Sequence, residues 1–391
     1  MHIQDPHQGA AFWQTGFRPF FLLAAVCAAI EIPLWAGLGQ VLLYPDYFSP
    51  ARGHAHEMIW GYASAVIAGF LLTAVRNWTN RPTASGKSLM LLVALWLTGR
   101  VALWLSLWLP ATVIAVADML FLPALLLAVT RPILLSANRR NYGIPVFLGL
   151  LIIGNAVMHA EALGMAPSLD TAWNTGLIGV LLFIALIGGR VIPFFSERAI
   201  HDYQGQRSKP VEWMVIIGIA LYGAANVLLP GVVAGSVALA TGLLACACWL
   251  LWMDRRIWTV PLLWVLYLGY GWLIAGLIFL GLADIGVWDD AMRSGIHALG
   301  IGCMGTLTLG MMARVALGHT GRELRAPVTA ILAFLLISLS ALIRVIMPWV
   351  DTGQYLLWIQ LSGLLWTMAF VTFLIGYSHI LISPRADGQP G

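Results

Sequence analysis

The chain has 391 residues, of which 60% are hydrophobic and 10% are charged, and its mean hydropathy is +0.86. A soluble protein carries roughly 25% charged residues, so this composition excludes an ordinary soluble enzyme. The formal net charge of +4 accompanies no nucleic-acid motif, which excludes nucleic acid as a partner. The composition predicts an all-α, polytopic membrane protein whose surroundings are the lipid bilayer.

A membrane-spanning helix needs about 20 mostly apolar residues. The sequence then predicts about twelve spans in a single transmembrane domain, residues 1–391, with short cytoplasmic tails at 1–17 and 383–391. The expected spans are 18–39, 55–77, 88–108, 110–130, 142–163, 172–195, 211–229, 232–252, 259–282, 294–318, 327–348 and 354–382. Pro110 and Pro230-Gly231 each mark a tight turn between two spans. No sequence repeat is convincing, and the polar stretch to Gln14 predicts no cleavable signal peptide.

The basic residues support this count and predict an orientation. With the N- and C-termini in the cytoplasm, 17 of the 21 Lys and Arg residues fall on the cytoplasmic side. Only Arg52 and Arg293 fall outside, while Arg100 and Arg344 lie within spans. This bias agrees with the positive-inside rule and supports both the span count and this orientation of a multi-pass protein.

Histidines and carboxylates gather at the predicted outer face. The second span begins with the sequence His54-Ala55-His56-Glu57-Met58, the fifth ends near His159 and Glu161, and the tenth begins near His297. Ionisable groups at membrane depth are costly and usually functional. A single His at a span end is more often an interfacial hydrogen-bonding group, but four in one leaflet indicate a cofactor or metal site.

Helix geometry refines this hypothesis. Residues two apart on a helix point about 200° from each other, so His54 and His56 are expected to face different neighbours. Asn155 and His159 are four apart and share a face. Thioethers in the same half of the membrane favour copper(I), although methionine in a membrane helix is usually packing; these are Met58, Met158 and Met304.

A second group of polar residues lies at the predicted inner face. His319 follows His297 by 22 residues, about 33 Å of helix, so the two cannot bind one metal. Arg190 and Arg314 lie at the same face. Such arginines usually reflect topology, but they would also suit the propionates or phosphates of a bound anion.

At these residues the chain resembles the NnrS family of bacterial membrane proteins. The resemblance extends over almost the whole chain, and its matching segments are Gly16–Phe21, His54–Met58, Ala68–Val75, Gly188–Phe195 and Arg314–Arg322 with His297 upstream. It implies a twelve-span, multi-pass protein of the bacterial inner (cytoplasmic) membrane that contains haem and copper and takes part in the response to nitric oxide and nitrosative stress. The chain departs from the family pattern where Arg76 replaces a Pro, Asn80 a Gly and Tyr267 a His. A phenolate from Tyr267 could bind haem iron, but a packed Tyr fits better.

No Cys-x-x-Cys-His motif is present, which excludes a covalent c-type haem and leaves a non-covalent haem b. We expect the metal ligands to be His54, His56, His159 and His297, divided between haem and copper, with Glu57 and Glu161 as catalytic proton relays. His319, Arg190 and Arg314 are further cofactor-binding candidates.

Three functions remain open from the sequence. The first is a haem–copper protein that binds nitric oxide or turns it over as an oxidoreductase, with an unknown electron donor. The second is a secondary transporter for a metal or metal–nitrosyl species, whose pathway would include Glu31, Arg100, Asp118 and Arg344. The third is a sensor or haem-binding chaperone without turnover. Bunching of the histidines at one face favours the first.

Overall fold

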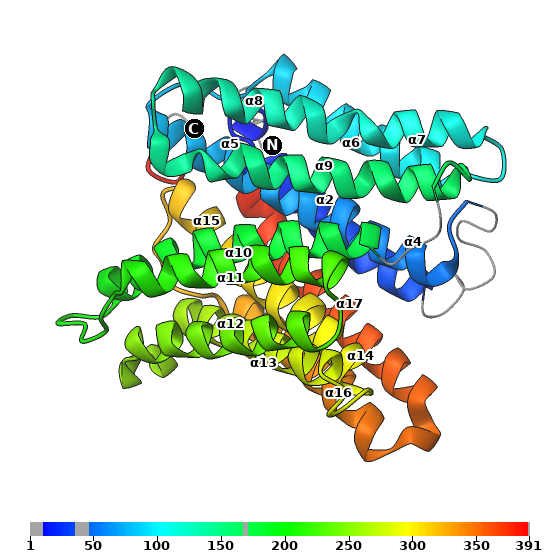
Figure 1. The fold of residues 1–391 in the computed structure, drawn as a ribbon. Coiled ribbons are helices and arrows are strands. Elements are labelled where there is room, and N and C mark those ends of the chain that lie inside the picture. The colour runs from blue at the N-terminus through cyan, green and yellow to red at the C-terminus, as the bar shows by residue number, and fades with distance from the viewer. Residues whose placement is uncertain (1–10, 36–46, 167–170, 390–391) are drawn as a thin grey trace. The chain divides into compact units, whose positions relative to one another are not determined.

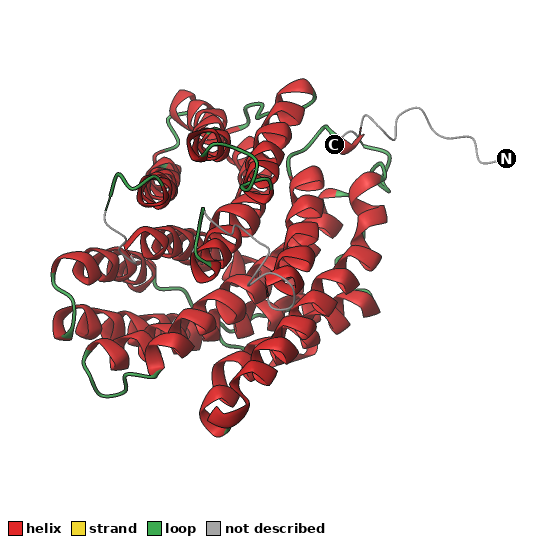
Figure 2. Cartoon of the chain, turned by 90° about the vertical axis from the view of Figure 1, so that its right-hand side faces the viewer, coloured by secondary structure: helices red, strands yellow, loops and turns green. Residues whose placement is uncertain are grey.

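The computed structural model describes residues 11–35, 47–166 and 171–389. Figure 2 shows that all regular structure among these residues is helical. Eleven of the helices are long and apolar enough to cross a membrane. The expected first span corresponds to α2, Phe17–Pro33, and its residues 36–39 lie outside the described part. The prediction of an all-α polytopic protein is therefore confirmed, while the cytoplasmic termini stay a prediction.

The chain divides into two compact units. Unit 1 comprises Met1–Leu177, Met312–Ala330 and Phe370–Gly391, and unit 2 comprises Ile178–Met311 and Ile331–Ala369. Each unit is described separately here, and the expectation of one transmembrane domain stays a prediction.

The helices follow one another in three sets of four (Figure 1). The first set contains α2, a long second helix, α6 (Lys87–Trp104) and a fourth helix formed by α7 (Ala111–Met119) and α8 (Phe121–Leu135). The long second helix consists of α4 (Pro50–His56), a π-helical segment η2 (Glu57–Ala63) and α5 (Ser64–Thr79).

The second set begins with a short 3-10 turn, η3 (Arg139–Asn141), and its helices are α9 (Gly143–Ala162), α10 (Thr171–Ala199), α11 (Lys209–Leu228) and α12 (Val232–Leu251). Figure 1 shows α11 and α12 side by side in unit 2, where they pack against each other.

The third set follows η4 (Arg255–Thr259) and starts with α13 (Pro261–Asp284). Its second helix again has three parts, α14 (Ala291–His297), the π-helical η5 (Ala298–Gly305) and α15 (Thr306–His319). The set ends with α16 (Val328–Val350), the short η6 (Thr352–Gln354) and α17 (Tyr355–Ile382).

The helix bounds therefore recur, although the sequence shows no convincing repeat. The second helices begin at residues 50, 171 and 291, the third helices at 87, 209 and 328, and the fourth at 111, 232 and 352. The spacing is about 120 residues each time, which is the pattern of a parallel internal repeat. Four crossings return a chain to its starting side, so sets of this kind would share one orientation.

The second helix of each set is the most buried. In the most apolar window of each, 83%, 78% and 67% of residues are buried, compared with at most 56% for the other spans. A helix that is apolar on all sides and surrounded by protein is a core helix, whereas the others expose one face. The three long helices are thus where polar side chains are shielded from lipid and water.

Both expected tight turns are present. α6 ends at Trp104 before α7 begins at Ala111, and α11 ends at Leu228 before α12 begins at Val232. Gly231 adopts a φ of +85°, a conformation that side chains disfavour and that ends one helix and begins the next within a few residues. Asn80, where the family pattern has Gly, ends α5 in the left-handed region at φ 51°. Asn tolerates this conformation better than most residues, so the departure keeps the helix end.

Candidate metal centre

Unit 1 contains a buried polar cluster formed by three helices of the first and second sets. His56 ends α4, Asp118 lies on α7, and His159 lies near the end of α9. One ligand atom from each of these side chains lies within 4.8 Å of the others, and all three residues are buried. Two imidazoles and a carboxylate are ligands that divalent transition metals accept.

Asp118 is the hub of this cluster. Its Oδ2 atom accepts hydrogen bonds from His159 Nε2 at 3.0 Å and from Asn155 Nδ2 at 2.7 Å, and it lies 3.3 Å from His56 Nε2. Its Oδ1 atom pairs with Arg100 Nη2. Gly99 makes this approach fit, because a Cβ atom there would lie 2.6 Å from Asp118 Oδ1.

His159 is satisfied as a neutral imidazole. Its Nε2 atom donates to Asp118, and its Nδ1 atom can accept the hydrogen of the Tyr47 hydroxyl, 2.6 Å away. This arrangement fixes one tautomer and orients the ring, as partners in the outer shell of metal sites do.

His56 is placed differently, because oxygen atoms surround both of its ring nitrogens. Nδ1 lies 2.9 Å from Glu57 Oε1, and Nε2 lies 2.9 Å from Asn155 Oδ1 as well as near Asp118. A neutral imidazole has only one N–H to donate. The second nitrogen therefore needs either a proton or a bound cation between it and the carboxylate.

The charged residues of the cluster also indicate that it needs a further proton or cation. Arg100 binds Glu57 Oε1 at 2.5 Å and also pairs with Asp118, while Glu57 faces Cys27 and Glu31 in a second group whose ligand atoms lie within 4.8 Å. Trp104 Nε1 donates to Glu31 at 2.9 Å. Two buried carboxylates thus share one arginine, with the buried Glu31 carboxylate nearby, and buried charge of this kind must be balanced by protons or a metal ion.

The local backbone also changes at this point. The helix switches from α to π geometry directly after His56, and all seven residues of η2 are buried. π-helical segments are rare and are found frequently at functional sites. The extra residue per turn places Glu57 and the following side chains where a regular α-helix would not.

Three other predicted site residues of unit 1, His54, Glu161 and His319, have different partners from those of His56 and His159. His54 is half-buried and stacks on Trp35, with ring centroids 4.4 Å apart, so it faces away from His56 as helix geometry predicts. Glu161 has a buried carboxylate that pairs with Arg52. His319 belongs to unit 1, where it lines a separate polar cavity.

The remaining candidates include residues of unit 2. His297 is half-buried there, and its Nδ1 lies 2.8 Å from the carbonyl oxygen of Arg293. Arg190 is half-buried on α10 in unit 2, while Arg314 is buried on α15 in unit 1. Tyr267, which stands where the family pattern has a His, is buried in unit 2 and donates to the carbonyl of Trp252 at 2.8 Å, in agreement with the expected packed Tyr.

The list of site residues predicted from sequence contained Glu57 but lacked the other partners of the histidines. Asp118 and Arg100 are charged residues in the interior of their spans, and that feature alone marks them as functional candidates. Asn155 shares a helix face with His159, which was a usable signal. Tyr47 lies before α4 with no motif around it, and only its contact with His159 identifies it.

Comparison with known proteins gives one strong result. No curated protein matches the chain. A family model described as NnrS protein matches residues 11–385, nearly the whole length. The chain therefore belongs to the NnrS family.

Proposed function

We propose that this protein is a bilayer-embedded, copper- and haem b-binding protein of the nitric oxide response, in the bacterial inner membrane. Membership of the NnrS family suggests a membrane protein of that response. The observation that supports a metal function most directly is His56, whose Nε2 faces only oxygen atoms in a buried cluster with excess negative charge.

Copper fits the residues of this cluster. His56, Asp118 and His159 would hold the ion, replacing the direct contacts between the two imidazoles and the Asp118 carboxylate. Glu57, which binds the other nitrogen of His56, would orient that ring and hold a proton nearby. The metal would supply the position at which nitric oxide coordinates, and Glu57 and Glu161 would relay protons.

Haem b belongs to the proposal through the family, with His54 and His297 as ligand candidates. His297 fits this role because an imidazole whose Nδ1–H binds a backbone carbonyl carries its lone pair on Nε2, the usual iron ligand. His319, Arg190 and Arg314 stay candidates for a further centre or for haem propionates.

Metal analysis of single variants tests the copper assignment. The variants are His56→Ala, Asp118→Asn and His159→Ala, and the matched control is His201→Ala, because His201 is an exposed residue of a loop. Loss of a ligand is expected to lower bound copper by roughly tenfold or more, measured by mass spectrometry and by the electron paramagnetic resonance signal. Full copper content in all three cluster variants would contradict the assignment.

A transporter is the second candidate, and one feature of unit 2 favours it. A cavity of 400 Å³ there is lined by Arg293, Arg344 and Asp290, and Arg344 is a buried charge within a span. The absorption spectrum of the purified protein separates the two proposals. A Soret band supports the haem–copper protein, whereas a colourless protein supports the transporter.

A further inference from the structure

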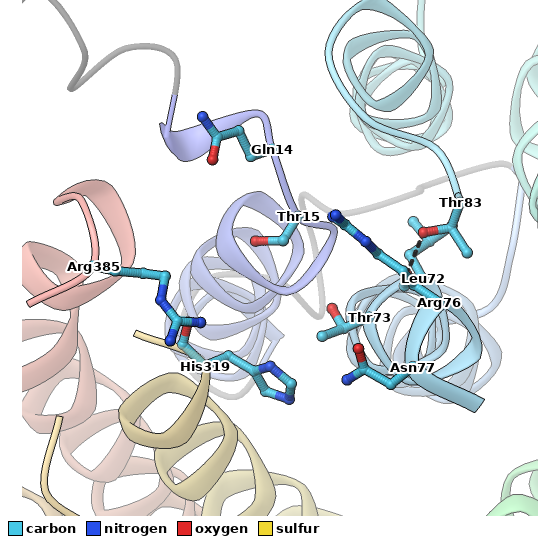
Figure 3. A pocket seen from close by; sticks show the side chains of 9 residues that line it. All are labelled: Gln14, Thr15, Leu72, Thr73, Arg76, Asn77, Thr83, His319 and Arg385. Atoms are coloured by element: carbon cyan, nitrogen blue, oxygen red, sulfur yellow. Dashed lines mark hydrogen bonds between the residues drawn. The ribbon is translucent and has the colours of Figure 1, made fainter. Parts of the chain in front are cut away.

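A polar cavity of 170 Å³ lies in unit 1, outside the cluster around His56, and its binding role goes beyond the function proposed above. Four segments that are distant in sequence form it: the turn before α2, the end of α5 with the loop that follows, the end of α15, and the C-terminal segment after α17. Figure 3 shows Arg76 and Arg385 extending into this space from opposite sides, with His319 below them.

The lining consists mainly of hydrogen-bond donors. Leu72 is the only apolar residue among the described residues that line the cavity, and none of them is a carboxylate. A site of this kind cannot hold an acyl chain, and it does not suit a metal cation. Its chemistry is that of an anion site.

The charge of the cavity comes chiefly from Arg76. Arg385 also lines the cavity, but its Nε and Nη2 atoms bind the Asp387 carboxylate at 2.9 and 2.5 Å, which offsets its charge. Arg76 makes no hydrogen bond or ion pair with any described residue and is exposed to the cavity and solvent. One uncompensated cation therefore remains.

Two other polar groups at the cavity have no partner within the described chain. The Thr15 hydroxyl is buried and makes no hydrogen bond, although a buried polar atom normally has one. The His319 ring lies 5.8 Å from the Phe17 ring but makes no hydrogen bond through its nitrogens to a described residue. A bound oxyanion would accept hydrogen bonds from both groups and from Arg76.

Helix dipoles do not determine whether this cavity prefers anions or cations. The positive end of α2 lies here, but so do the negative ends of α5 and α15. Anion selectivity therefore depends on the side chains, so substitution of one of them should change anion binding measurably.

Size limits the ligand. The cavity exceeds more than tenfold the ~10–15 Å³ that one water needs, yet it is below the ~300 Å³ at which cofactor-sized pockets begin. We propose that it binds a small oxyanion of the phosphate type through Arg76, His319 and Thr15, either as a free anion or as the headgroup phosphate of a membrane lipid.

Titration of the purified full-length protein in detergent with inorganic phosphate tests the site. Arg76→Gln is expected to weaken phosphate binding roughly tenfold or more, because one charge-assisted hydrogen bond is lost, and Thr15→Ala a few-fold. The matched control is Arg81→Gln, which removes an exposed arginine of the same loop region that does not line the cavity. It should bind phosphate as the unmodified protein does.

A second experiment, with phospholipid, identifies the source of the anion. The same proteins are delipidated, exposed to phosphatidylglycerol nanodiscs, and analysed by native mass spectrometry for retained phospholipid with and without phosphate. Phosphate binding that depends on Arg76 with unchanged lipid retention supports a free anion. Lipid retention that depends on Arg76 and is reduced by phosphate supports a headgroup.

The proposal is overturned if the unmodified protein binds neither probe, or if Arg76→Gln matches Arg81→Gln in both measurements. Equal thermal unfolding of the two variants verifies that the fold is retained, which the exposed position of Arg76 leads us to expect. None of these outcomes depends on copper or haem, so failure here leaves the metal proposal intact.

Discussion

The long second helices of the first and third sets have the same design but different surroundings. Each has an arginine four residues before a histidine, Arg52 with His56 and Arg293 with His297, and each turns π-helical directly after that histidine. In unit 1, His56 meets Asp118, Asn155 and Glu57. In unit 2, the Nδ1 atom of His297 lies at hydrogen-bonding distance from the carbonyl of Arg293, the residue one turn before it.

This difference teaches that the histidine motif alone does not determine which partners the imidazole meets. The backbone geometry repeats, but two partners of His56, the Asp118 carboxylate and the Asn155 amide, come from α7 and α9, which are separate helices. A ligand set depends on the neighbours that packing supplies. The following predictions separate the two regions, from the largest expected effect to the smallest.

The largest effect should follow removal of the hub carboxylate. Asp118→Ala leaves Arg100 and two imidazoles without their shared partner in a buried cluster, a change that typically costs about 3–5 kcal/mol. We expect a strong loss of folded protein, measured by size-exclusion yield and thermal unfolding in detergent.

Asp289→Ala is the matched control for this change, because Asp289 is exposed before α14 in unit 2. It should unfold close to the unmodified protein. If Asp118→Ala and Asp289→Ala unfold at the same temperature, the cluster is not the stabilising network described here.

The second effect concerns metal content. His56→Ala should lose copper while keeping the haem absorption, and His297→Ala should keep copper while losing intensity in the Soret band, because we assign the two residues to different cofactors. Metal analysis and optical spectra of the same samples measure both. Equal loss of copper in the two variants would indicate that both histidines bind the same metal, and would contradict their assignment to different cofactors.

The third effect compares two glycines, each five residues after its histidine. An added Cβ at Gly61 would lie 2.8 Å from Arg100 Nη1 and 2.9 Å from Glu57 Oε2, which are ends of side chains that can move. An added Cβ at Gly302 would lie 2.4 Å from the Trp272 ring and 2.8 Å from its Cβ, which cannot easily move.

Gly302→Ala should therefore destabilise the protein by about 1–3 kcal/mol through overpacking, without changing copper content. Gly61→Ala should destabilise it less but lower copper, because it shifts Glu57 and Arg100. Thermal unfolding and copper analysis on both variants measure this crossover. If Gly61→Ala were the more destabilising variant, or if Gly302→Ala were the variant that lost copper, the proposed link between η2 and the metal site would be contradicted.

The smallest effect concerns an ion pair between a buried carboxylate, Asp254, and the exposed guanidinium of Arg256. Asp254 lies outside the spans, and its hydrogen bonds with Arg256 hold the pKa of its carboxyl well below the usual value. A lowered pKa in the folded state stabilises the protein above the unfolded value of about 3.9, and this contribution is lost as the pH falls toward the folded pKa.

Asp254→Asn should therefore lower the unfolding temperature by only about one or two degrees at pH 7, since an ion pair whose arginine is exposed to solvent contributes little. The difference from the unmodified protein should shrink as the pH is lowered from 5 to 3. A difference that grows on acidification would reverse the sign argued here.

Parts of the candidate site could be predicted from residue spacing. The 200° separation of His54 and His56 follows from helix geometry, and in the structure one stacks on Trp35 while the other enters the buried cluster. The shared face of Asn155 and His159 follows in the same way. Spacing could not reveal that Asp118 meets both histidines, because that contact depends on how three helices pack.

The repeat of the helix bounds also could not be predicted from the sequence. Substitution of one apolar residue by another preserves a buried helix, so sets of helices can keep their lengths while their sequences diverge. Only the observed bounds show that the second helices begin about 120 residues apart.

By itself, the sequence determined the class of this protein, the approximate limits of its long apolar helices, and the two tight turns at Pro110 and Gly231. It predicted about twelve spans, of which eleven are long and apolar enough to cross a membrane among the described residues. These features follow from local composition, because a bilayer demands long apolar helices and turns demand particular residues. The tertiary structure alone decided which charges share a space. It joined Arg100, Asp118 and His159 around His56, and it closed a cavity around Arg76 from four distant segments, since such contacts arise from packing between helices and not from order along the chain.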